Sequence, residues 1–228
     1  MFIKSIKKRT PKLFFLICIS CLFITAILPM ADPVAIKSSF SSALSAATVP
    51  SGVNAVATNT SYNQTYLQDY PSTTNSIFTK IQGFINSMLN PQGWTLTDLK
   101  TLLTNAQNKS FLTSAQKAFT KGAIDGLNNL MSFSSALAAA TTPSSVNVIV
   151  TNASYNQPYL QNYPSTTNSV YAKIQGFVNS MSNPQGWILD DLGVLLTNAK
   201  IDTYLFSSAQ ITTIGNWLIQ VRNYSLLG

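Results

Sequence analysis

The sequence predicts an all-α protein built as a tandem duplication of a helical unit of roughly 93 residues, placed after an N-terminal signal or anchor helix. Residues 39–106 align with residues 132–199 without a gap, and 50 of these 68 positions carry the same residue. In both copies, apolar side chains recur at the spacing of a helix face. The predicted domains are residues 1–31 for the signal peptide or signal anchor, 32–131 for the first helical repeat and 132–228 for the second.

The first 31 residues have the layout of an export signal. Five basic residues precede the apolar run Leu13–Ala31, which is typical of a signal peptide. An uncleaved anchor that crosses the membrane through residues 13–31 is the alternative, because a run of this length spans a bilayer. In either case we expect residue 32 onward to be exported to the periplasm or the extracellular space, and the anchor would hold the protein at the inner membrane.

The composition narrows the classes of function. The chain contains no His and no Glu, and its two cysteines, Cys18 and Cys21, lie inside the apolar run. The usual residues for metal binding and for acid/base catalysis are therefore missing, and we expect neither a cofactor nor enzymatic activity. Beyond residue 31, nine basic and seven acidic residues remain. Isolated lysines do not form a basic face, so we expect no binding to nucleic acid.

Each repeat opens with a short helix. Phe40, Ala43, Leu44 and Ala47 fall at helical spacing, and Pro50 ends the run. For the segments that follow, at residues 53–58 and 146–151, we expect an extended connection. A short strand is the alternative, favoured by the β-branched residues of the second copy.

Three tyrosines spaced four residues apart come next in each copy. This spacing predicts a short helix with an aromatic face, although Pro158 lets the helix of the second copy begin only near Gln157. The rings either pack on the core with their hydroxyls at the rim or form a stacking surface for sugar rings or a partner protein. These tyrosines are Tyr62, Tyr66 and Tyr70 in the first copy and Tyr155, Tyr159 and Tyr163 in the second.

The strongest helical pattern begins after Pro71 and Pro164, where residues 72–76 offer several capping side chains. Gly83 and Gly176 lie inside this helix, and we expect another helix to approach closely there, since glycine is otherwise unfavourable. The apolar positions of this helix and the later leucine-rich helix predict the core. Its members are Ile81, Phe84, Ile85, Leu99, Leu102 and Leu103 in the first copy, and Ile174, Phe177, Val178, Leu192, Leu195 and Leu196 in the second.

The sequence NPQGW, at residues 90–94 and 183–187, predicts a turn in which the glycine takes a positive φ. We expect the tryptophan to pin the turn onto the core, with a ligand platform as the alternative. In the helix that follows, Asp98 and Asp191 lie in the first turn, and residues 95–98 resemble a capping box. A last helix, from about Ser114 to Met131, can continue into the second repeat without a break.

Some residues recur in both copies without an evident need in the core, and they form the candidate partner-binding surface. A duplicated surface allows bivalent attachment, which binds more tightly than either site alone. No catalytic and no metal-binding residue is predicted. The candidate surface comprises Tyr66, Tyr70, Asn90, Gln92 and Trp94, with Tyr159, Tyr163, Asn183, Gln185 and Trp187 as their counterparts.

The export signal, together with the neutral, Ser/Thr/Asn/Gln-rich block around YPSTTNS, KIQGF and NPQGW, resembles exported accessory proteins of bacterial envelope machines. Among these it resembles the IcmX-like periplasmic proteins associated with type IVB (Dot/Icm) secretion systems. The resemblance implies an envelope role in a secretion or conjugation apparatus without enzymatic activity. We therefore expect a non-catalytic binding or assembly component with protein partners in the cell envelope. The alternative is a secreted effector or enzyme with an unknown substrate.

Overall fold

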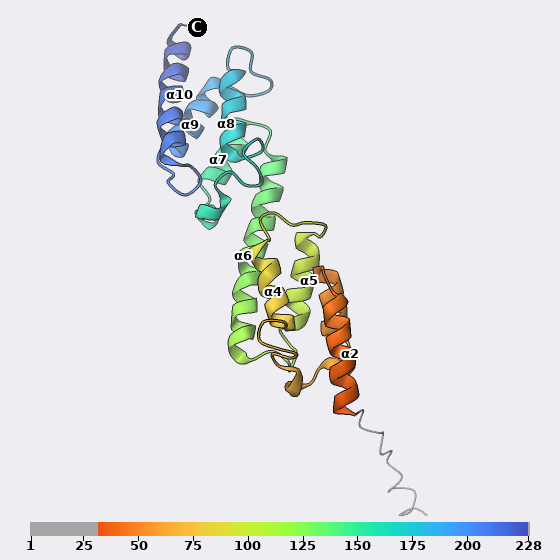
Figure 1. Ribbon diagram of the computed structural model, residues 1–228. Helices are drawn as coiled ribbons and strands as arrows, with labels where there is room; N and C mark the ends of the chain where they lie inside the picture. Colours follow the sequence, from red (N-terminus) through yellow and green to blue (C-terminus); the bar gives the residue numbers. More distant parts are fainter. Residues whose placement is uncertain (1–31, 228) are drawn as a thin grey trace, which may run out of the picture.

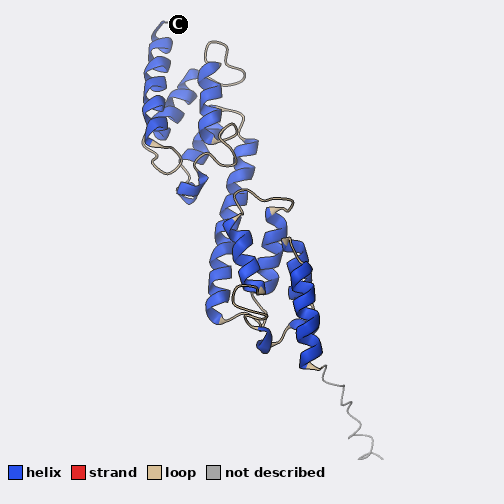
Figure 2. Cartoon of the chain, in the orientation of Figure 1, coloured by secondary structure: helices blue, strands red, loops and turns tan. Residues whose placement is uncertain are grey.

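The computed structural model describes residues 32–227, which form nine α-helices and no strand (Figures 1 and 2). The predicted all-α class is confirmed, while the predicted signal or anchor at residues 1–31 lies outside the described residues. The helices are α2 (Pro33–Ala46), α3 (Pro50–Thr58), α4 (Ile77–Asn86), α5 (Leu96–Ala106), α6 (Ser114–Ala139), α7 (Pro143–Val150), α8 (Val170–Asn179), α9 (Leu189–Ala199) and α10 (Ser208–Leu227).

The helices form two bundles that share α6, and Figure 1 shows the bundles stacked end to end along it. The first unit comprises α2 to α5 and the first half of α6, and the second comprises the rest of α6 and α7 to α10. Helix α6 runs unbroken through residues 131 and 132, where the two predicted repeats meet. Leu127 belongs to the core of the first unit, whereas Leu130, Phe133 and Leu137 belong to that of the second.

The segments at residues 53–58 and 146–151 are helical, so the predicted extended connection is wrong. Pro50 and Pro143 occupy the first position of α3 and α7, where the fixed φ favours a helix and the missing N–H costs no hydrogen bond. Val53, Val56 and Ala57 then fall on one face and are buried, because α3 packs against α5 and α7 against α9. Packing of this face outweighs the weak preference of β-branched residues for strands.

The tyrosine-containing segments are also corrected, because they form two 3₁₀ turns in each unit in place of one short helix. The turns are Thr60–Tyr62 and Thr65–Leu67 in the first unit, and Ala153–Tyr155 and Pro158–Leu160 in the second. Pro158 stands at the start of its turn, as its geometry requires. With the helix interrupted, the three tyrosines of each unit do not share one continuous face.

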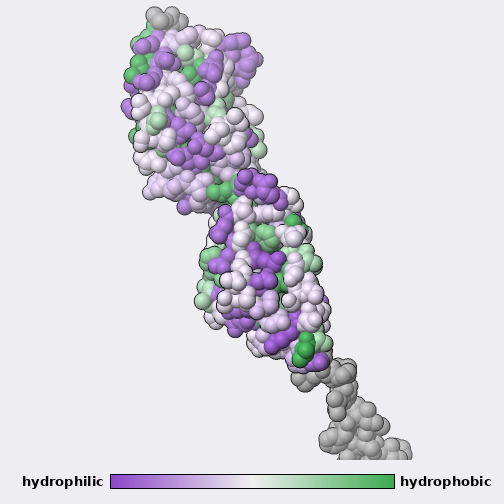
Figure 3. All heavy atoms as spheres, viewed as in Figure 1, coloured by the Kyte–Doolittle hydropathy of each residue, from purple (hydrophilic) through white to green (hydrophobic). Residues whose placement is uncertain are grey.

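Six predicted leucines of α5 and α9 and the isoleucines at 81 and 174 are fully buried, as predicted; the leucines are Leu99, Leu102, Leu103, Leu192, Leu195 and Leu196. Phe84, Ile85 and Phe177 are only half-buried and line the edge of the cores. The prediction of close helix approach at Gly83 and Gly176 is wrong: both are exposed, and nothing lies within 4 Å of where a Cβ would stand. Figure 3 shows a largely polar surface on the face drawn, with apolar residues scattered over both units.

Candidate binding surfaces

The ten candidate residues lie in two separate places in each unit. In the first unit, the tyrosines lie beside the middle of α2, where the rings of Tyr70 and Phe40 are 6.2 Å apart. The residues of the NPQGW turn lie near its end, where the Lys80 ammonium donates to the Ala47 carbonyl oxygen at 2.8 Å. Phe40 and Ala47 are about 10 Å apart along the helix, given a rise of about 1.5 Å per residue. The candidate surface of each unit is therefore divided in two.

The first tyrosine of each trio is a core residue. Tyr62 and Tyr155 are buried, and their rings meet Phe40 and Phe133 edge to face at 5.3 and 5.2 Å. Each hydroxyl shares a hydrogen bond with a serine on the adjoining helix, Ser39 at 2.6 Å and Ser132 at 2.9 Å. A buried phenol needs such a partner, and the serine is present in both copies.

The second and third tyrosines differ between the units. In the first unit Tyr66 is exposed, and the Lys37 ammonium lies 5.7 Å from its ring centre and 5.5 Å from that of Tyr70. This distance is typical of a cation–π contact.

In the second unit, Leu130 replaces Lys37 and is buried in the core. Tyr159 and Tyr163 are partly buried against that core, and burial raises the pKa of Tyr163, although a hydrogen bond with Ser134 offsets part of the effect. The two tyrosine surfaces are therefore not equivalent.

The loop that carries the tyrosines is fastened to the next long helix in the same way in both units. Asp69 and Asn162 adopt left-handed backbone conformations, with φ of 53° and 60°, which Asp and Asn tolerate better than most residues. Their side-chain oxygens accept hydrogen bonds from the amides of Gln116 at 2.8 Å and Gln210 at 2.9 Å. Each glutamine also completes a cap at the start of its helix, which explains why it recurs at an offset of 94.

The NPQGW turns have the same geometry in both units. Gly93 and Gly186 both have φ of +73°, as predicted for a tight reversal, and Trp94 and Trp187 pack edge to face on phenylalanines at 5.7 Å. Trp187 is only 8% exposed, so the tryptophans pin the turn onto the core. The Gln92 and Gln185 side chains donate to Asn90 and Asn183 at 3.1 and 3.2 Å and remain exposed.

A surface groove of about 390 Å³ lies beside the turn of the second unit. The Lys173 ammonium forms part of its wall and donates to the Ala140 carbonyl oxygen at 2.7 Å, and Gly176 leaves the backbone of α8 uncovered. All eight lining residues recur at the equivalent positions of the first unit. They are Ala140, Thr141, Lys173, Gly176, Phe177, Ser180, Gln185 and Trp187, matching Ala47, Thr48, Lys80, Gly83, Phe84, Ser87, Gln92 and Trp94.

Sequence reasoning found the glutamine and the tryptophan of this groove and missed its other members. Thr141 lies in the loop after α6, whereas Lys173 and Gly176 lie on α8 and Ser180 caps it, so that only the folded chain brings them together. The signal that could have found them is their recurrence, together with an exposed glycine that the fold does not require. The groove offers hydroxyl and amide groups beside aromatic edges, which suits an uncharged polar segment of a partner protein.

Comparison of the chain with models of protein families, with curated proteins and with solved structures gives no match. Within residues 32–227, no group of three or more potential metal-ligating side chains is gathered. None of the helices in this same range has both the length and the apolar character needed to cross a membrane.

Proposed function

We propose that this protein is an exported, non-catalytic binding and assembly component of a bacterial cell envelope structure, such as a secretion apparatus. In this proposal the two units are tandem copies of one helical unit of roughly 93 residues, and each offers a partner the groove beside its NPQGW turn. The N-terminal segment directs the chain out of the cytoplasm. The absence of His and Glu from the sequence favours binding over catalysis.

The observation that carries the proposal is the glycine of the groove. Glycine inside a helix costs about 1 kcal/mol relative to alanine, and neither Gly83 nor Gly176 avoids a clash or adopts a positive φ. The fold therefore gains nothing from glycine at either place, yet both units have it. Close approach of a partner to the bare helix backbone is a physical reason for a glycine at such a position.

All eight lining residues recur in the first unit, so in this proposal each unit offers the same groove, and two such grooves favour a partner that is itself repeated or extended. Binding at the second groove is intramolecular once the first is occupied, and linked sites of this kind strengthen attachment by about 10² to 10⁴. Loss of either groove should therefore weaken attachment far more than twofold.

The test is recovery of partners from envelope extracts by the full-length chain. We expect a Gly83→Gln, Gly176→Gln variant to lose its partners, because glutamine is a good helix former that covers the exposed backbone. The matched control is Gly122→Gln on α6, another exposed helix glycine with no neighbour within 4 Å, and it should recover partners as the wild type does. Equal recovery by the double variant and the control would contradict the groove hypothesis.

Two further variants resolve the remaining parts of the proposal. A Tyr66→Ala, Tyr159→Ala variant tests the tyrosine surface, and unchanged recovery would remove it from the binding site. A reporter that is active only outside the cytoplasm, fused to Gly228, tests export, and an inactive fusion would contradict it. Mass analysis of the mature chain distinguishes a cleaved signal from an anchor.

A further inference from the structure

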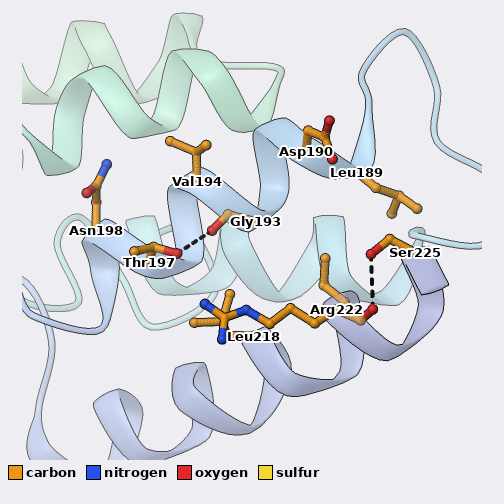
Figure 4. A pocket seen from close by; sticks show the side chains of 10 residues that line it. Leu189, Asp190, Gly193, Val194, Thr197, Asn198, Leu218, Arg222 and Ser225 are labelled. Carbon is orange, nitrogen blue, oxygen red and sulfur yellow. Dashed lines mark hydrogen bonds between the residues drawn. The ribbon is translucent and has the colours of Figure 1, made fainter.

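A second groove, of about 520 Å³, runs between α9 and α10 in the second unit, away from the NPQGW turn. Figure 4 shows its walls: Asp190, Gly193, Val194 and Thr197 come from α9, and Arg222 and Ser225 from α10. Its volume is in the range of pockets that bind small ligands.

Within α9, the positions that differ from the first unit lie in this groove. Helices α5 and α9 differ at three of eleven positions. Asp190, Gly193 and Val194 replace Thr97, Lys100 and Thr101, and all three line the groove. On the other wall, Arg222 and Ser225 stand where α6 has Asn128 and Met131. The residues that hold α9 in the core are the same as in α5, so the differences are concentrated on this surface.

The substitutions open the groove and place one charge of each sign in it. At position 193, glycine stands where the first unit has lysine, and no atom occupies the space of its missing side chain within 4 Å. Both Asp190 and Arg222 are exposed. The two hydrogen bonds drawn in Figure 4 are those of the Thr197 and Ser225 hydroxyls to backbone oxygens. Neither involves the Asp190 carboxylate or the Arg222 guanidinium.

The two charged groups lie apart on the two walls of the groove, Asp190 on α9 and Arg222 on α10. In Figure 4 the guanidinium of Arg222 extends toward Leu218 and Thr197, away from Asp190. Asp190 and Asn198, which mark the two ends on α9, are about 12 Å apart at the helical rise of about 1.5 Å per residue. An extended peptide covers this span with about three to four residues, at up to about 3.5 Å each.

We propose that the groove between α9 and α10 binds a short peptide with free ends, its carboxylate at Arg222 and its ammonium group at Asp190. The guanidinium fork binds a carboxylate through two parallel hydrogen bonds. The Asp190 carboxylate accepts hydrogen bonds from the ammonium group at the opposite end. Val194 and the space above Gly193 accommodate small side chains between the two ends. This site is separate from the surface on which the proposed function rests.

The experiment is calorimetric titration of the full-length chain, in a mild detergent, with tetraalanine that has free ends, with its N-acetylated form and with its C-terminal amide. We expect tetraalanine to bind with a dissociation constant of about 1 mM or lower. Each blocked peptide should bind about tenfold more weakly, the effect of losing one hydrogen-bonded charge.

The variants place residues of the first unit in the groove, where the same helix already tolerates them. Arg222→Asn should weaken the binding of tetraalanine but not that of the C-terminal amide, because the amide has no carboxylate for Arg222 to bind. Asp190→Thr should weaken the binding of tetraalanine but not that of the acetylated form, because the acetylated form has no ammonium group for Asp190 to bind. Gly193→Lys should abolish binding of all three by refilling the groove, with circular dichroism to verify folding.

Three results would overturn the proposal. The first is the absence of saturable binding of tetraalanine up to about 10 mM, tenfold above the expected constant. The second is equal binding of all three peptides. The third is competition by inorganic phosphate at the same concentration as tetraalanine, since this would assign the groove to any anion. Failure of the partner-recovery experiment would leave these results unchanged, because the two sites share no residue.

Discussion

The two units have the same inner framework and different outer surfaces. In both, a tyrosine hydroxyl shares a hydrogen bond with a serine, and a lysine donates to the carbonyl oxygen of the C-cap residue of α2 or α6. Two asparagines pair between α3 and α5 or between α7 and α9. The asparagine pairs are 3.0 and 2.8 Å long. These bonds satisfy polar groups at the points where loops and short helices meet.

The differences lie at helix ends and on exposed faces. Thr95 caps α5 in the first unit, whereas Ile188 begins α9 without a side-chain hydrogen bond. Lys37 lies over two tyrosine rings, whereas the equivalent Leu130 is buried, since α6 brings it into the core. The comparison teaches that the interior hydrogen bonds and core packing are common to both units. The residues that differ lie where a unit meets its neighbour or the solvent.

The largest expected effect comes from two leucines that lie three residues apart on α6. Leu127 and Leu130 are both fully buried, but in different cores. Replacing either with alanine should cost about 2 to 5 kcal/mol of unfolding free energy, through lost burial and a residual cavity. Hydrogen exchange should show Leu127→Ala reducing protection mainly in α4 and α5, and Leu130→Ala mainly in α8 and α9.

An equal loss of protection in both units from either change would contradict this separation. It would mean that α6 couples the two cores into one cooperative block. Leu226→Ala on the exposed end of α10 is the control, and it should change neither pattern, because this leucine is 84% exposed.

The class of fold and most of the core could be predicted because helical periodicity was strong and occurred twice. The errors occurred where periodicity was short or proline intervened. The segment at 53–58 has too few residues for a clear pattern, and its helix depends on contacts with α5 that a local reading does not include. The tyrosine spacing matched a helix, but the segment folds as separate 3₁₀ turns joined to distant side chains such as Gln116.

The candidate site was predicted in part for the same reason. The turn residues could be recognised from one contiguous motif, and they do lie together. Lys173 and Thr141 recur in both copies, but their recurrence does not reveal that they line one groove, because the groove forms only when the end of α6 meets α8 and the turn. The prediction that another helix packs closely against Gly83 and Gly176 is wrong. A glycine in a sequence does not reveal whether its open side faces a neighbouring helix or solvent.

A second prediction exchanges the helix caps of the two units. Ile188→Thr should stabilise the second unit by about 1 kcal/mol. The threonine oxygen would accept a hydrogen bond from a backbone N–H of the first turn, and the Asp191 side chain would complete a capping box. Thr95→Ile should destabilise the first unit by a similar amount. Chemical denaturation measures both, and opposite shifts of the midpoint are expected. Shifts of the same sign would show that the side-chain cap does not account for the difference.

A third prediction removes the cation that lies over the tyrosine rings of the first unit. Lys37→Met keeps the length of the side chain but removes its charge, and the cost should be about 0.5 to 1 kcal/mol, as for a partly exposed cation–π contact. Lys100→Met on α5 is the control for loss of a positive charge, because the cation over the rings of Tyr66 and Tyr70 is Lys37. Thermal unfolding of both variants measures the difference, and equal costs would contradict a specific contact with Tyr66 and Tyr70.

The smallest expected effect is the pH dependence of the α5 cap. The Thr95 hydroxyl donates to the Asp98 carboxylate at 2.7 Å and the Thr95 backbone N–H donates to it at 3.0 Å, and these bonds lower the pKa of Asp98. A carboxyl whose pKa is lower in the folded state stabilises that state above its unfolded pKa, near 3.9. This stabilisation is lost as the pH falls through the folded value.

We therefore expect the stability difference between the wild type and a Thr95→Val variant to be constant from about pH 7 to pH 5 and to shrink below about pH 4. Denaturation midpoints across this range measure it. Ile188→Val is the matched control, because the second unit has no side-chain cap at this position, and its difference from the wild type should not change with pH. The stability difference between the wild type and Thr95→Val could instead persist unchanged to pH 2, well below the usual aspartate range. That result would mean that the threonine acts by accepting the hydrogen bond from the Asp98 backbone N–H, at 3.1 Å, and not through the carboxylate.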